Sequence, residues 1–360
     1  MTIIEHDATT TDEFVEKLFT AVLGAQEVQA AYLGDRLGWY DALAEEPLTS
    51  TQLAERTGTS ERYAREWLEH QAVAGWLNCR NPEASYEDRV FEMPEAHKPA
   101  LCEPENLSYV LPFARMIAGL GQHIDSMVDA YRTDTGFSWA HQGHDARESQ
   151  AAANRPMFVH QLGQEYLSSI PEVDAALRAG GRVADIGAGY AWSSIGIATA
   201  YPAATVDAFD LDEPSIEMAH RNIATAGLSD RVTARCIDAA EVADTEDYDL
   251  VLALECIHDM PDPVSVLSTM RRLAGDDGTV IVMDENVSEV FTGQPDDVER
   301  VMYGFSIMCC LADGKAHDHS VETGTVMRPS TFEGYALEAG FDRVEILPIE
   351  NDFFRFYRLS

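Results

Sequence analysis

Lysine is nearly absent from this 360-residue chain and occurs only at positions 17, 98 and 315. Lysine and arginine together number 25 against 62 acidic residues, which gives a formal net charge of −37. Proteins that bind nucleic acid or anionic membranes generally do so through a positive surface. The charge therefore argues against either partner. Arginine in place of lysine fits a salt-rich cytoplasm, although a GC-rich genome also favours arginine.

Long apolar runs are also missing. No stretch approaches the roughly 18 consecutive apolar residues that a membrane helix needs, and residues 1–11 are polar and acidic, unlike a secretory signal. We therefore expect a soluble, cytoplasmic protein that does not associate with a membrane.

The sequence has no paired cysteine motif that would hold a metal cluster. Its six cysteines, at positions 79, 102, 236, 256, 309 and 310, contain no CxxC pair. We interpret them as reduced and mostly structural. His141 and His144 are three residues apart, but no third ligand follows at a useful spacing, so we expect no metal.

The length allows more than one hydrophobic core, because domains typically contain about 100 to 200 residues. Hydrophobic residues make up 46% of the chain. We expect a helical domain over residues 1–106, linking helices that cover the site over 107–175, and an α/β domain over 176–360.

The amino-terminal part has helical spacing of apolar residues over Asp12–Ala30 and again over Tyr32–Leu43. Leu48–Leu77 then predicts a helix-turn-helix, with Thr49 or Ser50 as the first N-cap, Gly58 as the stop and Ser60 as the second N-cap. Two strands of a small wing are expected in the sequence that follows, at Tyr86–Phe91 and Glu92–Pro99.

A helix-turn-helix suggests DNA recognition, but the charge of this one favours a module for dimerisation or substrate capping. Residues 48–77 contain three arginines and four glutamates, a balance of −1. A helix that reads a DNA groove normally needs net positive charge. We therefore expect no nucleic-acid partner.

Helical periodicity resumes in residues 107–135, and a loop is expected at Gly136–Ala146. A further helix is expected at Phe158–Ile170, and an inserted helical segment at Asp296–Leu311.

The carboxyl-terminal half begins with a strand, Arg182–Ile186, followed by a glycine turn and a helix. A dinucleotide-binding fold would have a small residue three positions after Gly189, where this chain has Trp192. Strands and helices then alternate, which predicts a doubly wound, Rossmann-like α/β sheet of seven strands. The further strands are expected at Ala204–Asp212, Arg231–Ile237, Tyr248–Ala253, Gly278–Met283, Phe341–Ile349 and Asp352–Leu359, the last two as an antiparallel hairpin.

The pattern D-x-G-x-G at Asp185–Gly189, with Asp210 closing the next strand, resembles the class I methyltransferases that use S-adenosylmethionine. The resemblance implies that the glycine turn lies against the amino-acid part of this cofactor and that Asp210 accepts from both ribose hydroxyls. It also implies that Asp238 accepts from the adenine amine. The cofactor-binding residues expected at these strand ends are Asp185, Gly187, Ala188, Gly189, Asp210, Leu211, Asp238, Ala239 and Glu255.

Two further segments resemble small-molecule O-methyltransferases. Ala31–Leu43, followed by the winged helix, is similar to their amino-terminal domain, which implies a homodimer. Asn154–Met157 resembles the FNxxM segment of caffeate-type enzymes, which implies that Met157 contacts the substrate or the methionine moiety. Ordinary helix packing is the alternative for Met157.

Ile257–Pro263, IHDMPDP, resembles the HDWxD loop of the same family, with Met260 in place of tryptophan. The resemblance implies that His258 is the general base; the alternative is that His258 only supports the turn or lines the pocket. Its neighbour Asp259 is one candidate for the orienting carboxylate, and Glu255, Asp284 and Glu285 are equal candidates, because adjacent side chains need not face each other. Tyr303, Phe305, Met308, His317 and His319 are expected to wall the acceptor pocket.

The function implied is methyl transfer from S-adenosylmethionine to a hydroxyl of a small, aromatic molecule. Methylation of nitrogen or carbon remains an alternative, as does a transcriptional regulator that senses the cofactor. A nicotinamide-dependent oxidoreductase is disfavoured by Trp192.

Overall fold

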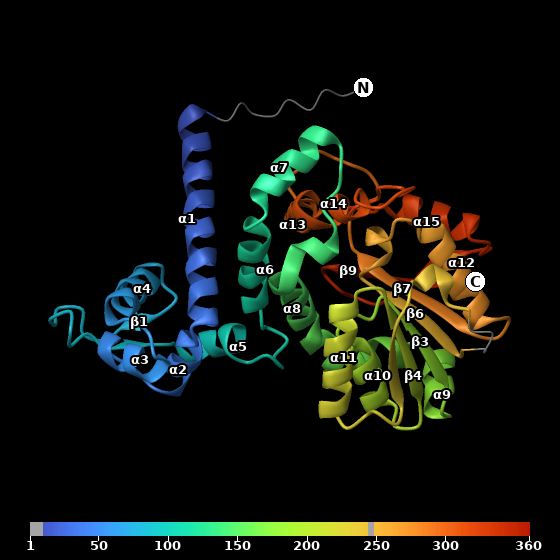
Figure 1. Ribbon diagram of the computed structural model, residues 1–360, viewed down its shortest axis with the longest axis horizontal. Helices are drawn as coiled ribbons and strands as arrows, with labels where there is room; N and C mark the ends of the chain where they lie inside the picture. Colours follow the sequence, from blue (N-terminus) through green and yellow to red (C-terminus); the bar gives the residue numbers. More distant parts are fainter. Residues whose placement is uncertain (1–9, 244–247) are drawn as a thin grey trace. The chain divides into compact units, whose positions relative to one another are not determined.

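The computed structural model describes residues 10–243 and 248–360 and divides the chain into two compact units, Met1–Ala118 and Gly119–Ser360. Figure 1 labels the helices and strands of both. Within the described residues, every helix is too short or too polar to cross a membrane. The three-part division expected from the sequence remains a prediction.

The first unit starts with two helices, as predicted, but the break between them lies elsewhere. α1 spans Thr11–Arg36 without interruption, and α2 spans Trp39–Glu45. The predicted break near Ala30 is wrong because the chain turns only at Gly38, which has a φ of 67°. A glycine adopts this left-handed conformation without the steric cost of a side chain.

The helix-turn-helix is confirmed as α3, Ser50–Thr57, and α4, Glu61–Val73. Thr49 is the first N-cap: its side chain accepts from the Gln52 backbone N–H, and the Gln52 side chain accepts from the Thr49 backbone N–H. Gly58 ends α3 in the left-handed conformation. Local capping signals therefore located both helices correctly.

The wing strands are not where they were predicted. The two antiparallel strands are β1, Asn78–Cys79, and β2, Phe91–Glu92. Beyond β2 the chain forms a short 3-10 helix η1, Glu95–His97, and helix α5, Lys98–Leu101, with Pro99 in its first turn. Proline has no N–H to donate to a strand ladder but is tolerated in a first helical turn, so Glu92–Pro99 could not be a strand.

Three helices follow: α6, Leu111–Gly121, which runs across the boundary of the units, then α7, Ile124–Thr133, and α8, Trp139–Met157. The loop predicted at Gly136–Ala146 is wrong from Trp139 onward, because α8 begins there and continues through a kink at Gly143. The predicted helix Phe158–Ile170 is a π-helix, η2, Phe158–Tyr166, and a 3-10 turn, η3, Leu167–Ser169.

The second unit contains the predicted sheet of seven strands, and its hairpin is antiparallel as expected. The strands occur in the order β5-β4-β3-β6-β7-β9-β8, and the first five are parallel. Their bounds are β3 Arg182–Ile186, β4 Thr205–Asp210, β5 Val232–Cys236, β6 Leu250–Leu254, β7 Thr279–Glu285, β8 Val344–Ile346 and β9 Phe354–Leu359.

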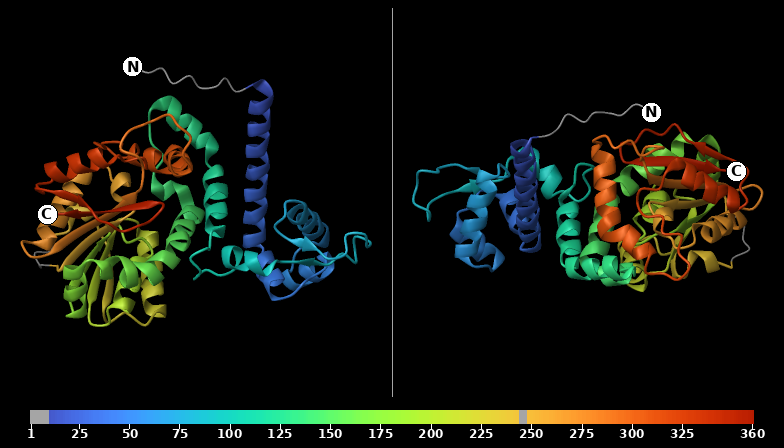
Figure 2. Two further views of the ribbon diagram at one scale, coloured as in Figure 1. Left: turned by 180° about the vertical axis from the view of Figure 1, so that it is seen from behind. Right: turned by 90° about the horizontal axis from the view of Figure 1, so that it is seen from above.

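Helices cover both faces of this sheet, as the two views in Figure 2 show. One core lies between the sheet and η2, α9 (Pro171–Arg178), α10 (Trp192–Ala200) and α11 (Glu213–Thr225). The other lies against α12 (Pro263–Ala274) and α15 (Pro329–Glu338). Contact between η2 and α10 requires Gly196, because a Cβ there would come within 2.0 Å of the Phe158 carbonyl oxygen.

The inserted segment expected at Asp296–Leu311 is helical, as predicted. It consists of α13, Asp297–Phe305, the π-helical turn η6, Ser306–Cys310, and the short α14, Leu311–Gly314. It follows β7 in the chain, and this connection brings Cys310 close to the loop that follows β6.

Candidate active site

The candidate site lies where the direction of the strand order changes. From β3 the chain adds β4 and β5 on one side of the sheet, and β6 and β7 on the other. In parallel sheets such a switch point leaves a crevice outside the carboxyl ends of the strands, where ligands bind. The predicted site residues follow β3, β4, β5, β6 and β7 at these ends.

Asp185 is a buried carboxylate of β3 that organises the start of α10. Its Oδ2 accepts hydrogen bonds from the hydroxyls of Ser193 and Ser194, both at 2.6 Å. Burial raises its pKa to about 6, although the two hydroxyls act in the opposite direction. These hydrogen bonds connect β3 to α10 across the glycine turn. Direct contact of Asp185 with a cofactor remains a prediction.

The glycine turn directs its backbone N–H groups toward the protein. The N–H groups of Gly187 and Ala188 both donate to the Phe209 carbonyl, at 2.8 and 3.0 Å. These bonds hold the turn against the end of β4, and its contact with the cofactor remains a prediction. Gly187 is required by the turn itself, because its φ is 69° and a Cβ there would lie 2.7 Å from the Cys256 sulfur.

Asp210 at the end of β4 is connected to the same turn. Its Oδ2 accepts from the Gly189 N–H at 2.7 Å, and its Oδ1 accepts from the Asp212 N–H at 2.8 Å. Asp212 is the N-cap of α11, so Asp210 does not have that role. Leu211, between them, has an exposed side chain.

Asp238 follows β5 and caps a short 3-10 helix, η4, Ala239–Glu241. Its Oδ1 accepts from the Ala240 N–H at 2.9 Å. This bond holds Asp238 and Ala239 in a defined turn at the carboxyl edge of the sheet. Adenine recognition by Asp238 remains a prediction.

Glu255 has a left-handed backbone, with φ of 57°, immediately after β6. Such a conformation is uncommon for a residue with a side chain and often marks a functional site. Asn154 on α8 donates to its carboxylate at 2.5 Å. Burial raises the pKa of Glu255 to about 7, against the opposing effect of that bond. Sequence reasoning did not identify Asn154 as its partner, although Asn154 opens the segment that resembles FNxxM.

Met157 packs against the core beneath η2 and α10. The Asn351 side chain donates to its sulfur at 3.8 Å and to the Tyr166 hydroxyl at 3.1 Å. The packing alternative for Met157 is therefore supported by its surroundings. A contact with substrate or cofactor remains a prediction.

His258 lies in a short 3-10 helix, η5, Ile257–Asp259, and only 3% of its surface is exposed. Its Nδ1 is 2.8 Å from Asp284 Oδ1 and 2.9 Å from Glu285 Oε2, both at the end of β7. Its Nε2 is 3.2 Å from Asp259 Oδ1. Of the four carboxylates considered as orienting groups, Asp259, Asp284 and Glu285 contact the imidazole.

Three carboxylates around one imidazole change its protonation. Burial alone would lower the pKa of His258, but Asp259, Glu285 and Asp284 outweigh it and raise the pKa well above 6.5. The neighbouring carboxylates therefore stabilise the protonated imidazole. Burial would raise the pKa of Asp284, yet His258 lowers it, so Asp284 is ionised.

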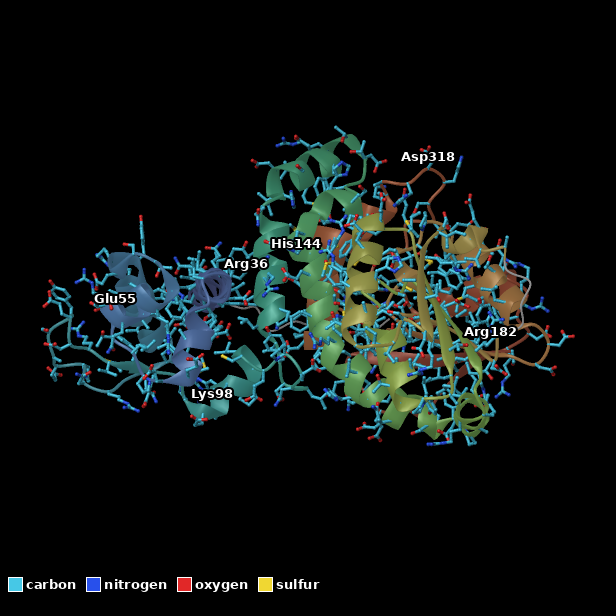
Figure 3. All side chains as sticks on the ribbon, turned by 60° about the horizontal axis from the view of Figure 1, so that its bottom comes forward. Arg36, Glu55, Lys98, His144, Arg182 and Asp318 are labelled. Atoms are coloured by element: carbon cyan, nitrogen blue, oxygen red, sulfur yellow. The ribbon has the colours of Figure 1, made fainter. Side chains whose placement is uncertain are left out.

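Of the residues expected to wall the acceptor pocket, His317 lines a hollow of about 530 Å³ with His141, Lys315 and Asp318. Tyr303, Phe305, Met308 and His319 do not line this hollow, and the acceptor pocket remains a prediction. His144 lies exposed on α8, near Glu148 rather than His141, and Asp318 lies exposed after α14 (Figure 3).

A buried ion pair and a ring contact near the site were not predicted. Arg147 on α8 donates to both oxygens of Asp212, at 2.7 and 2.8 Å. Arg155 lies over the Trp192 ring at 4.0 Å. Both contacts connect α8 to the ends of the strands, and they join residues 37 to 65 positions apart, which local patterns do not reveal.

This sheet order, with acidic residues at the strand ends, defines a Rossmann-like α/β fold. Residues 183–278 match the family described as "Methyltransferase domain", and residues 29–101 match the "Rv2258c-like winged HTH domain". Each match covers less than half of the chain, so the similarity is to a methyltransferase domain in the second unit and to a winged helix-turn-helix domain in the first.

Comparison with individual proteins agrees with this assignment. The chain is 33% identical over 150 residues to 27-O-demethylrifamycin SV methyltransferase of Amycolatopsis mediterranei (strain S699), covering 41% of this chain. That alignment spans 55% of the relative's length. The solved structure of the mitomycin 7-O-methyltransferase MmcR has a TM-score of 0.71 at 21% identity, covering 96% of this chain and 97% of its own. PigF with SAH has a TM-score of 0.74 at 17% identity, covering 98% and 100%.

Proposed function

We propose that this protein transfers a methyl group from S-adenosylmethionine to a hydroxyl of a small, aromatic molecule. The observation that carries the proposal is His258, an imidazole at the carboxyl end of β6 whose Nδ1 contacts a buried carboxylate. The names of the rifamycin and mitomycin methyltransferases support a hydroxyl acceptor.

S-adenosylmethionine is proposed to bind along the ends of β3, β4 and β5. Asp210, whose oxygens already order the glycine turn, accepts from the ribose hydroxyls, and Asp238 accepts from the adenine amine. Glu255 and Met157 are proposed to lie near the methionine part. The bound cofactor supplies the electrophilic methyl group. The protein holds the acceptor oxygen in line with it and excludes water.

Gly189→Val tests the cofactor site. Gly189 has a φ of 52° with no atom within 4 Å of a Cβ, so the substitution adds a side chain in open space beside Asp210. We expect the affinity for S-adenosylmethionine to fall by at least about tenfold, or about 1.4 kcal/mol, as measured by calorimetry. Gly227→Val is the matched control, since Gly227 has a φ of 70° and equally open surroundings at the end of α11. If folded Gly189→Val protein binds S-adenosylmethionine as tightly as wild type, the assignment of Gly189 to the cofactor site is contradicted.

In the proposed reaction, His258 takes the proton of the acceptor hydroxyl at Nε2. The contact with Asp284 assigns the Nδ1 proton to that bond and so orients the imidazole. Asp259 contacts Nε2 and must give way to the acceptor for this transfer to occur.

The pKa of His258 predicts how the rate depends on pH. Only the neutral imidazole accepts a proton, and the surrounding carboxylates raise the pKa of His258 well above 6.5. Turnover should therefore be low near pH 6.5 and should rise with pH above it. Asp259→Asn removes one of the carboxylates that raise this pKa, so the pH range over which turnover rises should move to lower pH. The assignment of His258 as the base is contradicted if turnover rises over the same pH range in both proteins.

Release of S-adenosylhomocysteine provides the direct test of the function. The purified full chain is incubated with S-adenosylmethionine and hydroxylated aromatic acceptors, and mass spectrometry identifies the methylated atom. Release above background with a methylated hydroxyl is expected. Methylation only at nitrogen or carbon would replace the proposal by its alternative.

We also propose that the protein is a homodimer. Apolar side chains repeat along α1 at Phe14, Leu18 and Val22, and these are 45 to 58% exposed in the single chain. Twofold dimers are the commonest oligomers and bury such surfaces.

Light scattering should give twice the chain mass at tens of micromolar. Leu18→Glu should favour the monomer, whereas the control Lys17→Glu on the same helix should remain dimeric. A monomeric wild-type protein would contradict the homodimer.

The location is proposed to be the cytoplasm, since all six cysteines are free, as is usual in a reducing compartment. The negative balance of the helix-turn-helix supports a role other than DNA binding.

A further inference from the structure

Two segments that are distant in the sequence, the 3-10 helix η5 and the π-helical turn η6, provide three potential metal ligands. Side-chain ligand atoms of His258, Asp259 and Cys310 all lie within 4.8 Å of one another. Imidazole nitrogen, carboxylate oxygen and thiolate sulfur are the three ligand types that bind Zn²⁺ in proteins. The set is mixed in type, so it is more specific than a cluster of acidic side chains.

The second contact of His258 gives independent support. Metal-binding histidines almost always donate their other ring N–H to a carboxylate or carbonyl group. His258 has this arrangement, because Nδ1 is 2.8 Å from Asp284 Oδ1 and both side chains are almost fully buried. The Nδ1 proton is thereby held on the side of β7. Nε2, on the side of Asp259, is left to bind the metal.

The distances suit a small tetrahedral ion. In a site with ligand bonds of about 2.0 Å to nitrogen and oxygen, those two atoms lie about 3.3 Å apart. Nε2 of His258 and Oδ1 of Asp259 are 3.2 Å apart. The Cys310 sulfur lies within 4.8 Å of both atoms, and a bond of about 2.3 Å to the same ion would place it about 3.5 Å from each.

The surroundings of this cluster are partly open to solvent, because the Asp259 side chain is 37% exposed and Cys310 is partly exposed. The two ligand atoms nearest each other are enclosed: Asp259 Oδ1 is buried, and the His258 side chain is 2% exposed. The neighbouring Cys309 is buried, so it is not the accessible thiol of the pair. Asp259 and the Cys310 thiolate together carry two negative charges, which balance a divalent ion.

We propose that His258, Asp259 and Cys310 form a Zn²⁺ site that inhibits the enzyme. A zinc ion at Nε2 replaces the proton there and leaves a fourth position open to water. The inhibitory effect rests on the proposed function of His258 as the base, because the metal occupies the nitrogen that takes the acceptor proton. Metal binding itself does not depend on that function.

Zn²⁺ and Co²⁺ titrations of the metal-free full chain test the site without acceptor or cofactor. Competition with a chromophoric chelator measures Zn²⁺ affinity, and Co²⁺ reports the ligand set through the absorption of a thiolate–cobalt bond. Cys310→Ser should weaken Zn²⁺ binding by at least about tenfold and abolish the thiolate absorption. Cys309→Ser, at the adjacent buried thiol, is the matched control and should retain both. Asp259→Asn should weaken Zn²⁺ binding while retaining the thiolate absorption.

The proposal is overturned if Cys310→Ser binds Zn²⁺ as tightly as wild type, or if both cysteine variants lose affinity equally. Inhibition is measured against each variant's own metal-free rate. Micromolar Zn²⁺ should inhibit wild type and Cys309→Ser more strongly than Cys310→Ser. A protein that binds Zn²⁺ through Cys310 but methylates no acceptor refutes the proposed function and leaves the metal site standing.

Discussion

Turnover of the His258→Ala variant on a neutral hydroxyl acceptor is expected to fall by about 10² to 10⁴-fold, the usual contribution of a general base. This corresponds to about 3 to 5 kcal/mol of activation free energy. The loss follows because the imidazole that Asp284 orients is the proposed proton acceptor. Steady-state kinetics with saturating S-adenosylmethionine measure it.

Two measurements distinguish a loss of catalysis from damage to the fold: the affinity for S-adenosylmethionine, and the dependence of turnover on the ionisation of the acceptor. The affinity of His258→Ala for S-adenosylmethionine should stay within about threefold, a free-energy change below about 0.7 kcal/mol. The loss of turnover should shrink for acceptors that are already ionised at the assay pH. His144→Ala, a change of an exposed histidine on α8, should leave turnover unchanged. Retention of more than about a third of wild-type turnover by His258→Ala, when chemistry is rate-limiting, would mean that positioning alone carries the reaction.

A loss of about 3 to 5 kcal/mol of unfolding free energy is expected for Arg147→Met, because removing one member of a buried ion pair leaves the other charge without compensation. Arg147 donates two hydrogen bonds to Asp212, and their side chains are 9% and 11% exposed. The pair links α8 to the N-cap of α11 beside Asp210. Urea denaturation monitored by circular dichroism measures the loss.

Two variants make this prediction specific. Arg178→Met breaks an ion pair with Asp174 whose arginine is 64% exposed, and the unfolding free energy should change far less than in Arg147→Met, because exposed ion pairs contribute little. Arg147→Met combined with Asp212→Asn should recover part of the stability, because no unpaired charge remains and asparagine still serves as an N-cap. Equal losses in Arg147→Met and Arg178→Met would show that the first pair is solvated.

The α/β half of the fold was predictable because each signal was local. Apolar runs such as Tyr248–Ala253 mark strands buried on both faces, and the glycines after Ile186 mark a turn that only they can adopt without strain. The strand ends then had to meet at one edge of a parallel sheet. That geometry brings Asp185, Asp210 and His258 to a common crevice.

Two secondary-structure predictions were wrong in short segments whose residues favour more than one conformation. Glu92–Pro99 was predicted as a strand although it contains two prolines, and the missing N–H of Pro99 favoured a helical turn. Gly136–Ala146 had the glycine content of a loop, yet α8 continues through it with one kink at Gly143. The first error could have been avoided from the local sequence, whereas the second concerns a kinked helix that glycine content alone does not reveal.

The sequence by itself determined the order of strands and helices in the α/β half, the helix-turn-helix, the glycine turn and the position of His258 after β6, because these follow from periodicity, capping and backbone freedom within a few residues. Only the tertiary structure decided the surroundings of His258. The carboxylates of Asp284 and Glu285 lie 26 and 27 positions further along the chain, and Cys310 lies 52 positions away. Their approach depends on the pairing of β6 with β7 and on the packing of the inserted helices. The pKa of the imidazole depends on that approach, because electrostatic interactions act through space and strengthen when water is excluded.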